Sequence, residues 1–475
     1  MIFEAVIGLE IHVEMKTKSK MFSSAPVGFG NLPNTNVVPL DMAFPGTMPL
    51  VNKQAVINAI RVAHALNMEI DRELWFDRKN YFYSDLPKGY QITQQERPIG
   101  KNGYLFIKSG GETRRIEIER IHLEEDTCKQ LHFSDYTLLD YNRAGVPLIE
   151  IVSRPDFRNG NEAMSYVENI RSIVQYLDVS NGKMEEGSLR CDVNVSIRPV
   201  GTKQLGTKVE VKNLNSIANV GTAVDYEIQR QEKLILSGGK VIQETRRYDD
   251  ETKETVLMRV KSNAVDYKYF VEPNIVPIVL SEQFIKDAIV TSSELASSKF
   301  ERYLKLGLNE YDASIIVSDK NTSRYFDEAI KTKASPKLLA NWLIVDIQAV
   351  LNKNGIEIKD FTITPARLGE LVMMIEKNEI SNKQGRDVFV QMLESKSSPK
   401  EISEKLGFAL INDEEEILRF VLEVLNKNEQ SIIDFKNGKD RAFGFLVGQV
   451  MKLSHGKVNP SLASKILMQE LQRRK

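Results

Sequence analysis

The sequence predicts an α+β fold, in which a mixed, largely antiparallel sheet domain is followed by an all-helical domain and a small helical tail. Up to about residue 290, strand-like alternation predominates without regular strand–helix–strand spacing, which favours antiparallel pairing. After Ser281 the apolar spacing is helical almost throughout. A chain of 475 residues is long enough for about two to four domains.

Five segments alternate between apolar and polar residues, as half-buried strands do. In Arg115–Leu123 the apolar phase changes, which predicts a β-bulge or a bend near Glu119-Arg120. The other four are Ile7–Met15, Leu148–Val152, Leu189–Ile197 and Lys208–Lys212.

Two helices are expected in the same domain. Apolar residues at helical spacing predict one that is capped by Asn161 and reaches Leu177. A second, over about residues 219–236, ends at Gly238-Gly239, because glycine accepts the left-handed conformation that terminates helices.

The chain changes character between Pro273 and Pro277, and Pro365 and Pro399 mark later helix starts or linkers. We therefore expect a first domain at residues 1–292, a helical domain at 293–405 and a tail at 406–475.

The overall net charge of −1 gives no global basic field. The C-terminal part is asymmetric, because residues 399–434 hold nine acidic and four basic residues, whereas residues 436–475 hold nine basic and two acidic. Such a reversal indicates an appended contact surface, with a self-solvating basic helix as the alternative.

The two cysteines, Cys128 and Cys191, cannot form a disulfide framework and indicate a reducing compartment. No leader pattern and no apolar run of membrane-spanning length is present, so we expect a soluble, cytoplasmic protein without membrane association. Sequence motifs for a P-loop, a dinucleotide-binding turn and a serine nucleophile elbow are also missing. Any ATP would therefore be bound through metal and scattered side chains, and any hydrolytic nucleophile would come from another subunit.

The first strand offers a candidate metal site. Glu10, His12 and Glu14 share its polar face, and carboxylates with an imidazole suit Mg²⁺ or Mn²⁺. A solvated polar face is the alternative. Glu150 lies within an apolar run, where an unpaired carboxylate is costly, so it is either a ligand or the partner of a cation such as Arg143.

Three further segments carry polar side chains that suit nucleotides. The acids Glu124-Glu125-Asp126 end one strand, although a solvated charge run is the alternative. Two strands present mixed polar rows that fit a phosphate site, namely Arg190, Asp192, Asn194 and Ser196, and Lys208, Glu210 and Lys212. Residues 78–83 and 87–91 interleave basic and aromatic residues, as loops that stack on bases do, with an aromatic core edge as the alternative.

Long motifs in this order resemble the B subunits of aspartyl/glutamyl-tRNA(Asn/Gln) amidotransferases. They are residues 6–14, 76–83, 139–152, 184–194, 210–215, 444–452 and 456–460. The resemblance implies a cradle-shaped catalytic domain, a helical domain and a tail that binds tRNA.

The resemblance also implies a ligase that forms a C–N bond with glutamine as amide donor. The side-chain carboxylate of Glu-tRNA(Gln), Asp-tRNA(Asn) or both is phosphorylated by ATP and then amidated by ammonia. An amidase A subunit makes the ammonia, and a small C subunit completes a heterotrimer.

By the same resemblance, Glu10, His12, Glu125 and Glu150 are the expected Mg²⁺ or Mn²⁺ ligands, with Asp192 as a further candidate. Glu125, Glu150 and Lys79 are the expected catalytic residues. Charge and strand face suggest phosphate contacts for Lys79, Arg190, Lys208 and Lys212. The basic tail would meet the tRNA backbone.

Some members of that family carry four cysteines of a zinc site, and the corresponding positions here are Ser23, Ala25, Val38 and Asp41. We therefore expect no structural zinc. Two alternative functions remain: a non-catalytic scaffold that presents aminoacyl-tRNA to a partner, and a metal-dependent enzyme that acts on free nucleotides.

Overall fold

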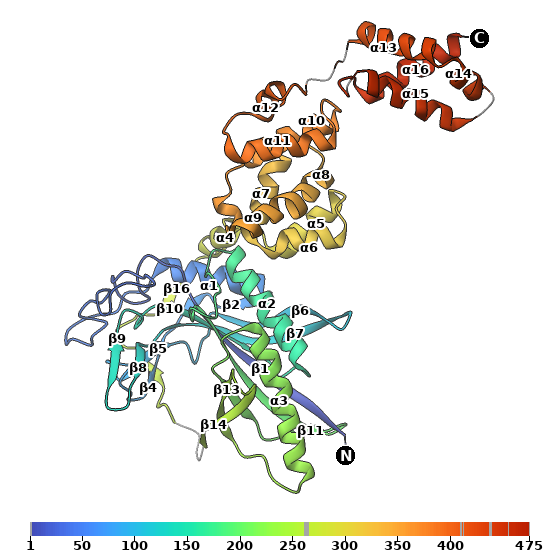
Figure 1. Cartoon of the computed structure of the whole chain (residues 1–475). Helices are drawn as coiled ribbons and strands as arrows, with labels where there is room; N and C mark the ends of the chain where they lie inside the picture. Colours follow the sequence, from blue (N-terminus) through green and yellow to red (C-terminus); the bar gives the residue numbers. More distant parts are fainter. Residues whose placement is uncertain are drawn as a thin grey trace. The chain divides into compact units, whose positions relative to one another are not determined.

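The computed structural model describes residues 2–260, 266–408, 411, 413–436, 439–454 and 456–474. The chain forms two compact units, Met1–Leu295 and Ala296–Lys475. The first contains a large sheet with helices and the second is helical (Figure 1), so the predicted α+β class is confirmed.

A nine-stranded sheet forms the centre of the first unit, in the order β14-β13-β12-β11-β1-β10-β7-β6-β2. Neighbouring strands are antiparallel except for the parallel pair β12–β13, which confirms a mixed, largely antiparallel sheet. The strands are β1 (Phe3–Glu14), β2 (Glu69–Ile70), β6 (Gly100–Ser109), β7 (Glu112–Glu125), β10 (Pro147–Ser153), β11 (Leu189–Pro199), β12 (Val209–Lys212), β13 (Glu244–Asp249) and β14 (Glu254–Val260).

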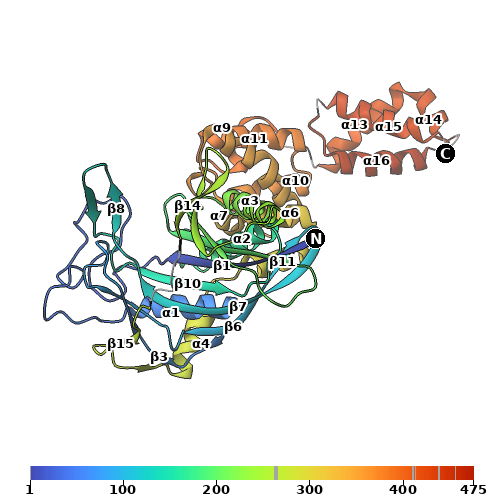
Figure 2. The ribbon, with the colours of Figure 1, turned by 90° about the horizontal axis from the view of Figure 1, so that it is seen from below.

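The two faces of the sheet differ because the sequence of β1 alternates strictly. Leu9, Ile11 and Val13 are buried in one apolar cluster together with residues of the helices α1 (Lys53–Ala65), α2 (Gly160–Tyr176) and α3 (Ile217–Leu236). Figures 1 and 2 show α2 and α3 against this side of the sheet. Each buried aliphatic side chain contributes about 1.5–3 kcal/mol, so the helices fix which face of the sheet stays polar.

The predicted helices are present, with one corrected start. The N-cap of α2 is Asn159 rather than Asn161, because Asn159 is extended and its side chain accepts a hydrogen bond from the backbone N–H of Glu162 at 3.0 Å. The α3 helix begins slightly earlier than expected, with Ser216 as its cap. It ends before Gly238, whose φ of +84° requires the left-handed conformation.

The predicted β-bulge is also present. Val152 pairs with Arg120, but its neighbour Ser153 pairs with Ile118, so Glu119 is the extra residue on β7. After this bulge, Ile121 and Leu123 lie in the apolar core. His122, which lies between them, and Glu124, which follows Leu123, therefore point to the polar face of the sheet.

In the described part of the first unit, three small sheets accompany the large one: β15-β4-β5, β16-β3 and β8-β9. Their strands are β3 (Glu73–Leu74), β4 (Asp77–Asn80), β5 (Tyr90–Thr93), β8 (Lys129–His132), β9 (Thr137–Asp140), β15 (Phe270–Val271) and β16 (Ile278–Val279), and α4 (Glu282–Val290) follows them. A fork-like ion pair joins β4 to the residue after β15: Arg78 donates from Nε and Nη2 to the fully buried Glu272 carboxylate at 2.6 and 3.0 Å.

The connection between β1 and α1 is organised by a buried lysine. Lys20 is fully buried, and its Nζ lies 3.1 Å from Asp41 Oδ2 and donates to the carbonyl of Tyr141 at 3.1 Å. Asp41 also accepts a hydrogen bond from the backbone N–H of Val38. Val38 and Asp41, two of the four positions that correspond to zinc ligands in some relatives, thus belong to this ion-paired turn. The absence of structural zinc stays a prediction.

The described residues of the second unit form two apolar clusters, one built from α5–α12 and one from α13–α16. Its further division into two domains stays a prediction. The elements are α5 (Ala296–Lys305), α6 (Glu310–Ser318), α7 (Lys320–Ile330), α8 (Pro336–Asn341), the π-helix Trp342–Ile347, α9 (Gln348–Asn354), the 3₁₀-helix Ile358–Asp360, α10 (Pro365–Glu376), α11 (Asn382–Glu394), α12 (Pro399–Lys405), α13 (Glu414–Lys427), α14 (Glu429–Lys436), α15 (Asp440–Leu453) and α16 (Pro460–Arg473).

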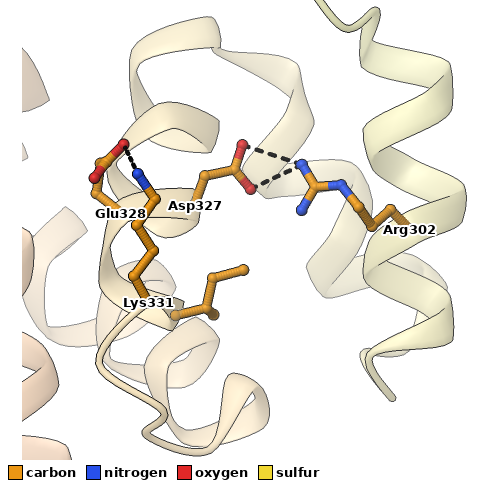
Figure 3. A pocket seen from close by; sticks show the side chains of 5 residues that line it. Arg302, Asp327, Glu328 and Lys331 are labelled. Carbon is orange, nitrogen blue, oxygen red and sulfur yellow. Dashed lines mark hydrogen bonds and ion pairs between the residues drawn. The ribbon is translucent and has the colours of Figure 1, made fainter.

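A shallow pocket in this unit is lined by paired charges (Figure 3). Arg302 Nη2 lies 3.0 and 3.1 Å from the two oxygens of Asp327, and Lys331 Nζ lies 2.6 Å from Glu328. These ion pairs satisfy the charges that line the pocket. Among the described residues, no helix combines the length and the apolar character needed to cross a membrane.

We expect Arg78→Leu to destabilise the first unit by about 3 kcal/mol or more, because it leaves the Glu272 carboxylate buried without its partner. The measurement is guanidinium chloride denaturation followed by circular dichroism and by tryptophan fluorescence, to which Trp75 contributes. Arg72→Leu is the matched control, since its ion pair with Glu282 is exposed and contributes less than about 1 kcal/mol. Equal destabilisation by the two variants would contradict the assignment.

Candidate active site

Neighbouring strands bring two histidines and three carboxylates together on the polar face of the sheet. The register places His12 on β1 opposite Glu150 on β10, and Glu150 opposite His122 on β7. Glu10 and Glu124 lie two residues from His12 and His122, on the same face of their strands. We call these five residues the acid–imidazole cluster.

Glu150 is the centre of this cluster. Its Oε2 lies 3.4 Å from Nε2 of His12 and 3.2 Å from Nε2 of His122. His12 Nε2 also lies 3.5 Å from Glu10, and His122 Nε2 lies 3.5 Å from Glu124. Two overlapping ligand sets result, each with one donor atom per residue within 4.8 Å of the others: Glu10, His12 and Glu150, and His122, Glu124 and Glu150.

The charged forms of the two histidines and of Glu150 stabilise one another. Burial disfavours each imidazolium, but hydrogen bonds and charge from Glu150, with neighbouring carboxylates, raise the pKa of His12 and of His122 to about 9. The imidazoles in turn hold the pKa of Glu150 well below its usual range, although burial alone would raise it. Burial and the charge of Glu150 raise the pKa of Glu10 to about 7.

The donor set fits a divalent cation. Carboxylate oxygens suit Mg²⁺ and Mn²⁺, and imidazole nitrogen suits Mn²⁺. A cation at this position would supply the positive charge that the imidazolium groups otherwise provide, and its binding would release protons. The cluster therefore has the donor set of a divalent-cation site.

The structure places Glu125 outside the acid–imidazole cluster. Its carboxylate forms an ion pair with Lys88 and accepts a hydrogen bond from the backbone N–H of Ile92 at 3.0 Å. Successive residues of a strand point to opposite faces, so Glu125 faces away from Glu124. The expected convergence of Glu125 with Glu10, His12 and Glu150 is thus not found, and its neighbour Glu124 takes that place.

His122 and Glu124 were not singled out as ligands by the sequence analysis. The bulge at Glu119 gives the signal that identifies them, because the apolar phase of Ile121 and Leu123 after it assigns both to the polar face. Carrying this alternation to the end of the strand selects Glu124 from the three consecutive acids.

Arg190 and Asp192 lie on β11 next to the cluster but have other partners. Arg190 is opposite His12, and its Nη2 lies 2.7 Å from Asp126, which is also 3.7 Å from Arg143. Asp192 is opposite Glu10 and forms an ion pair with Lys212. Arg143 thus pairs with Asp126 rather than with Glu150.

Glu14 and Lys208, two further residues of the predicted polar faces, lie outside the acid–imidazole cluster. Glu14 shares a hydrogen bond with Asp126, and burial followed by the charge of Asp126 raises the pKa of Glu14 to about 8. Lys208 is exposed and directly precedes β12. It is not among the residues that form the acid–imidazole cluster.

Lys79 approaches the cluster from β4. Burial alone would lower its pKa, but the charges around it, chiefly that of Glu124 and also that of Glu150, raise it. The ammonium group therefore lies within electrostatic range of both carboxylates. The ammonium group of Lys79 and the two carboxylate–imidazole ligand sets thus belong to one site.

Comparison with known proteins identifies the family. A family model described as "GatB/GatE catalytic domain" matches residues 5–286, more than half of the chain, and includes the whole acid–imidazole cluster. The chain belongs to the GatB/GatE family. A second model of this family, described as "GatB domain", matches residues 324–471.

Members of the GatB/GatE family resemble this chain over its full length. The B subunit of the aspartyl/glutamyl-tRNA(Asn/Gln) amidotransferase from Oceanobacillus iheyensis is 49% identical over 474 residues, and the protein of the same name from Bacillus cytotoxicus is 50% identical over 474 residues. Each alignment covers 99% of this chain and 100% of the relative. The resemblance seen in the sequence motifs is confirmed.

We expect Glu124→Gln to weaken Mn²⁺ binding at least about tenfold, because it removes a negatively charged donor from one ligand set. Glu125→Gln serves as the matched variant one residue away, and we expect a smaller effect because its partner is Lys88. Mn²⁺ titration of the protein, followed by electron paramagnetic resonance, measures both affinities. A larger loss in the Glu125 variant would contradict the placement of the ligands.

Proposed function

We propose that this chain is the catalytic subunit of a tRNA-dependent amidotransferase. It would use ATP to phosphorylate the side-chain carboxylate of Glu-tRNA(Gln), Asp-tRNA(Asn) or both, and then convert the phosphorylated group into an amide with ammonia. The single observation that carries this proposal is the buried acid–imidazole cluster beside Lys79, in a chain about half identical along its length to proteins named as amidotransferase B subunits.

The chemistry explains why such a cluster is needed. A carboxylate is a poor acyl donor, so its oxygen attacks the terminal phosphorus of ATP, the bond to the ADP oxygen breaks, and an acyl phosphate forms. Ammonia then attacks the carbonyl carbon and inorganic phosphate leaves with its electron pair. Transfer of the phosphoryl group depends mainly on positioning and on neutralising phosphate charge.

The residues divide between holding a cation and contacting phosphate. The acid–imidazole cluster would hold one or two divalent cations, which neutralise charge on the transferred phosphoryl group when bound. Lys79 is the leading candidate for a phosphate contact, since its ammonium group lies within electrostatic range of the cluster. Arg190 is paired with Asp126, and Lys212 is paired with Asp192. Each cation would contact phosphate either while it keeps this partner or after it leaves it.

The proposed function includes partner subunits. The sequence lacks a serine nucleophile elbow, so glutamine hydrolysis would take place on an amidase A subunit, and a small C subunit would complete the complex. The relatives are named as one subunit of an amidotransferase, which supports a multi-subunit assembly. The ammonia would then pass from the amidase to the sheet domain of this chain.

The main alternative is a tRNA-binding scaffold without catalysis. A scaffold does not require two ligand sets on the polar face of the sheet, one of them fully buried and the other partly buried, because each unpaired buried charge is costly. The cluster therefore favours the catalytic proposal.

Replacement of Glu150 by Ala should reduce ATP-dependent phosphorylation of charged tRNA at least about 100-fold, because Glu150 belongs to both ligand sets. Binding of tRNA should remain largely intact. The assay follows transfer of labelled phosphate to Glu-tRNA(Gln) and Asp-tRNA(Asn) in the assembled complex, with Glu117→Ala on β7 as the control. Full activity of the Glu150 variant would exclude the catalytic proposal.

The tail should contribute salt-dependent affinity for tRNA. Lys452 and Lys457 are both exposed, and each lost phosphate contact reduces the slope of log Kd against log salt by about one. We expect a double Lys452→Gln/Lys457→Gln variant to show a smaller slope, and a chain ending at Phe408 to show a still smaller one. Residue Ala409, where the deletion begins, lies outside the described residues.

Filter binding at several salt concentrations measures these slopes. The control is Lys400→Gln, an exposed lysine on α12, which precedes the tail. An unchanged slope in both tail variants would rule out the tail as a phosphate contact.

A further inference from the structure

Two tyrosine rings flank the ammonium group of Lys79, and a third tyrosine adjoins them. The ammonium nitrogen lies 4.9 Å from the ring centroid of Tyr267 and 5.9 Å from that of Tyr81. Tyr267 contacts both Tyr81 and Tyr269, with centroids 5.9 and 6.0 Å apart. We call Tyr81, Tyr267 and Tyr269 the tyrosine group.

The tyrosine group is held in place by backbone contacts between distant segments. The backbone N–H of Asn80 donates to the carbonyl of Tyr267 at 3.0 Å, and the side-chain amide of Asn80 donates to the carbonyl of Lys268 at 2.7 Å. The pairing of β15 with β4 and the Arg78–Glu272 ion pair fix the same two segments. The rings are therefore anchored by the fold rather than carried on an isolated loop.

The rings contact one another edge to face, so each contact covers at most one face of one ring. The interplanar angles are 71° for Tyr81 and Tyr267 and 68° for Tyr267 and Tyr269. Tyr269 is 37% exposed, and the other two rings are partly exposed. An exposed aromatic face beside a cation stacks readily on a planar base with a nearby phosphate.

The position of the tyrosine group limits what such a base can be. Lys79, which the rings flank, lies in electrostatic range of Glu124 and Glu150 in the acid–imidazole cluster. Both reactants of the proposed function contain an adenine. One is ATP, and the other is the 3′-terminal adenosine of tRNA, to which the amino acid is esterified.

We propose that the tyrosine group is a stacking platform for the adenine ring of a substrate, beside the phosphate-binding ammonium of Lys79. This inference rests on the proposed function and assigns its base-binding residues. The same chemistry recognises adenine from either source, so the experiment has one arm for each. If the rings had a purely structural role and only positioned Lys79, their loss would weaken the binding of ligands that lack adenine to the same extent.

The experiment compares Tyr267→Leu and Tyr269→Leu with the ring-retaining variants Tyr267→Phe and Tyr269→Phe in the assembled complex. One arm measures binding of Mg²⁺-ADP and of Mg²⁺-pyrophosphate, which lacks the base. The other measures binding of uncharged tRNA(Gln) with and without its terminal adenosine. Tyr104→Leu is the matched control, because Tyr104 also has an edge-on aromatic neighbour, Phe106, and a cation, Arg115, near its ring.

We expect the Leu variants to raise the Kd of one adenine-containing probe about 5- to 100-fold, since stacking on an aromatic ring typically contributes this much. The Phe variants and the control should stay within about twofold of the native protein, as should binding of the matching adenine-free probe. A loss confined to ADP assigns the platform to ATP, and a loss confined to intact tRNA assigns it to the terminal adenosine.

The inference is overturned if both adenine-containing probes bind the Leu variants as well as the native protein. It is also overturned if the adenine-free probe loses affinity to the same extent, because the rings then act only through Lys79. Neither result affects the test of the proposed function, which depends on the loss of phosphoryl transfer in the Glu150 variant.

Discussion

The carboxylate of Glu150 is buried between the imidazoles of His12 and His122, and the N-terminal unit is arranged around this contact. A carboxylate inside an apolar strand is stable only if positive charge or hydrogen bonds compensate for lost water. Here the compensation comes from both neighbouring strands, at the register positions directly opposite. The cluster therefore exists because three antiparallel strands are aligned to within a single residue.

That alignment is maintained by the apolar side of the same strands. Leu9, Ile11 and Val13 are buried beneath helices, so a shift of β1 by one residue would exchange the core with the polar face. The packing that stabilises the sheet thus also determines which side chains reach the site. The Arg78–Glu272 ion pair joins segments nearly 200 residues apart. It holds together the two segments that carry Lys79 and the tyrosine group.

Alternation along single strands predicted much of this arrangement. It identified the polar face of β1 with Glu10 and His12, the unusual burial of Glu150 and the bulge near Glu119. It did not separate Glu124 from Glu125, because three consecutive acids offer donors to both faces of a strand. The partners of Glu125, Arg190 and Asp192 also could not be read from local pattern, since Lys88, Asp126 and Lys212 come from other segments.

The extra residue at Glu119 has a consequence for how the chain can change in length. Loops between strands accommodate insertions and deletions at the surface, because they leave the strands themselves unaltered. Loss of one residue at this position would instead exchange the two faces of the rest of β7. His122 and Glu124 would then point into the apolar core, and Leu123 would point to the polar face of the sheet. Natural variation in chain length should therefore spare this point of the sheet, whereas neighbouring hairpins remain permissive.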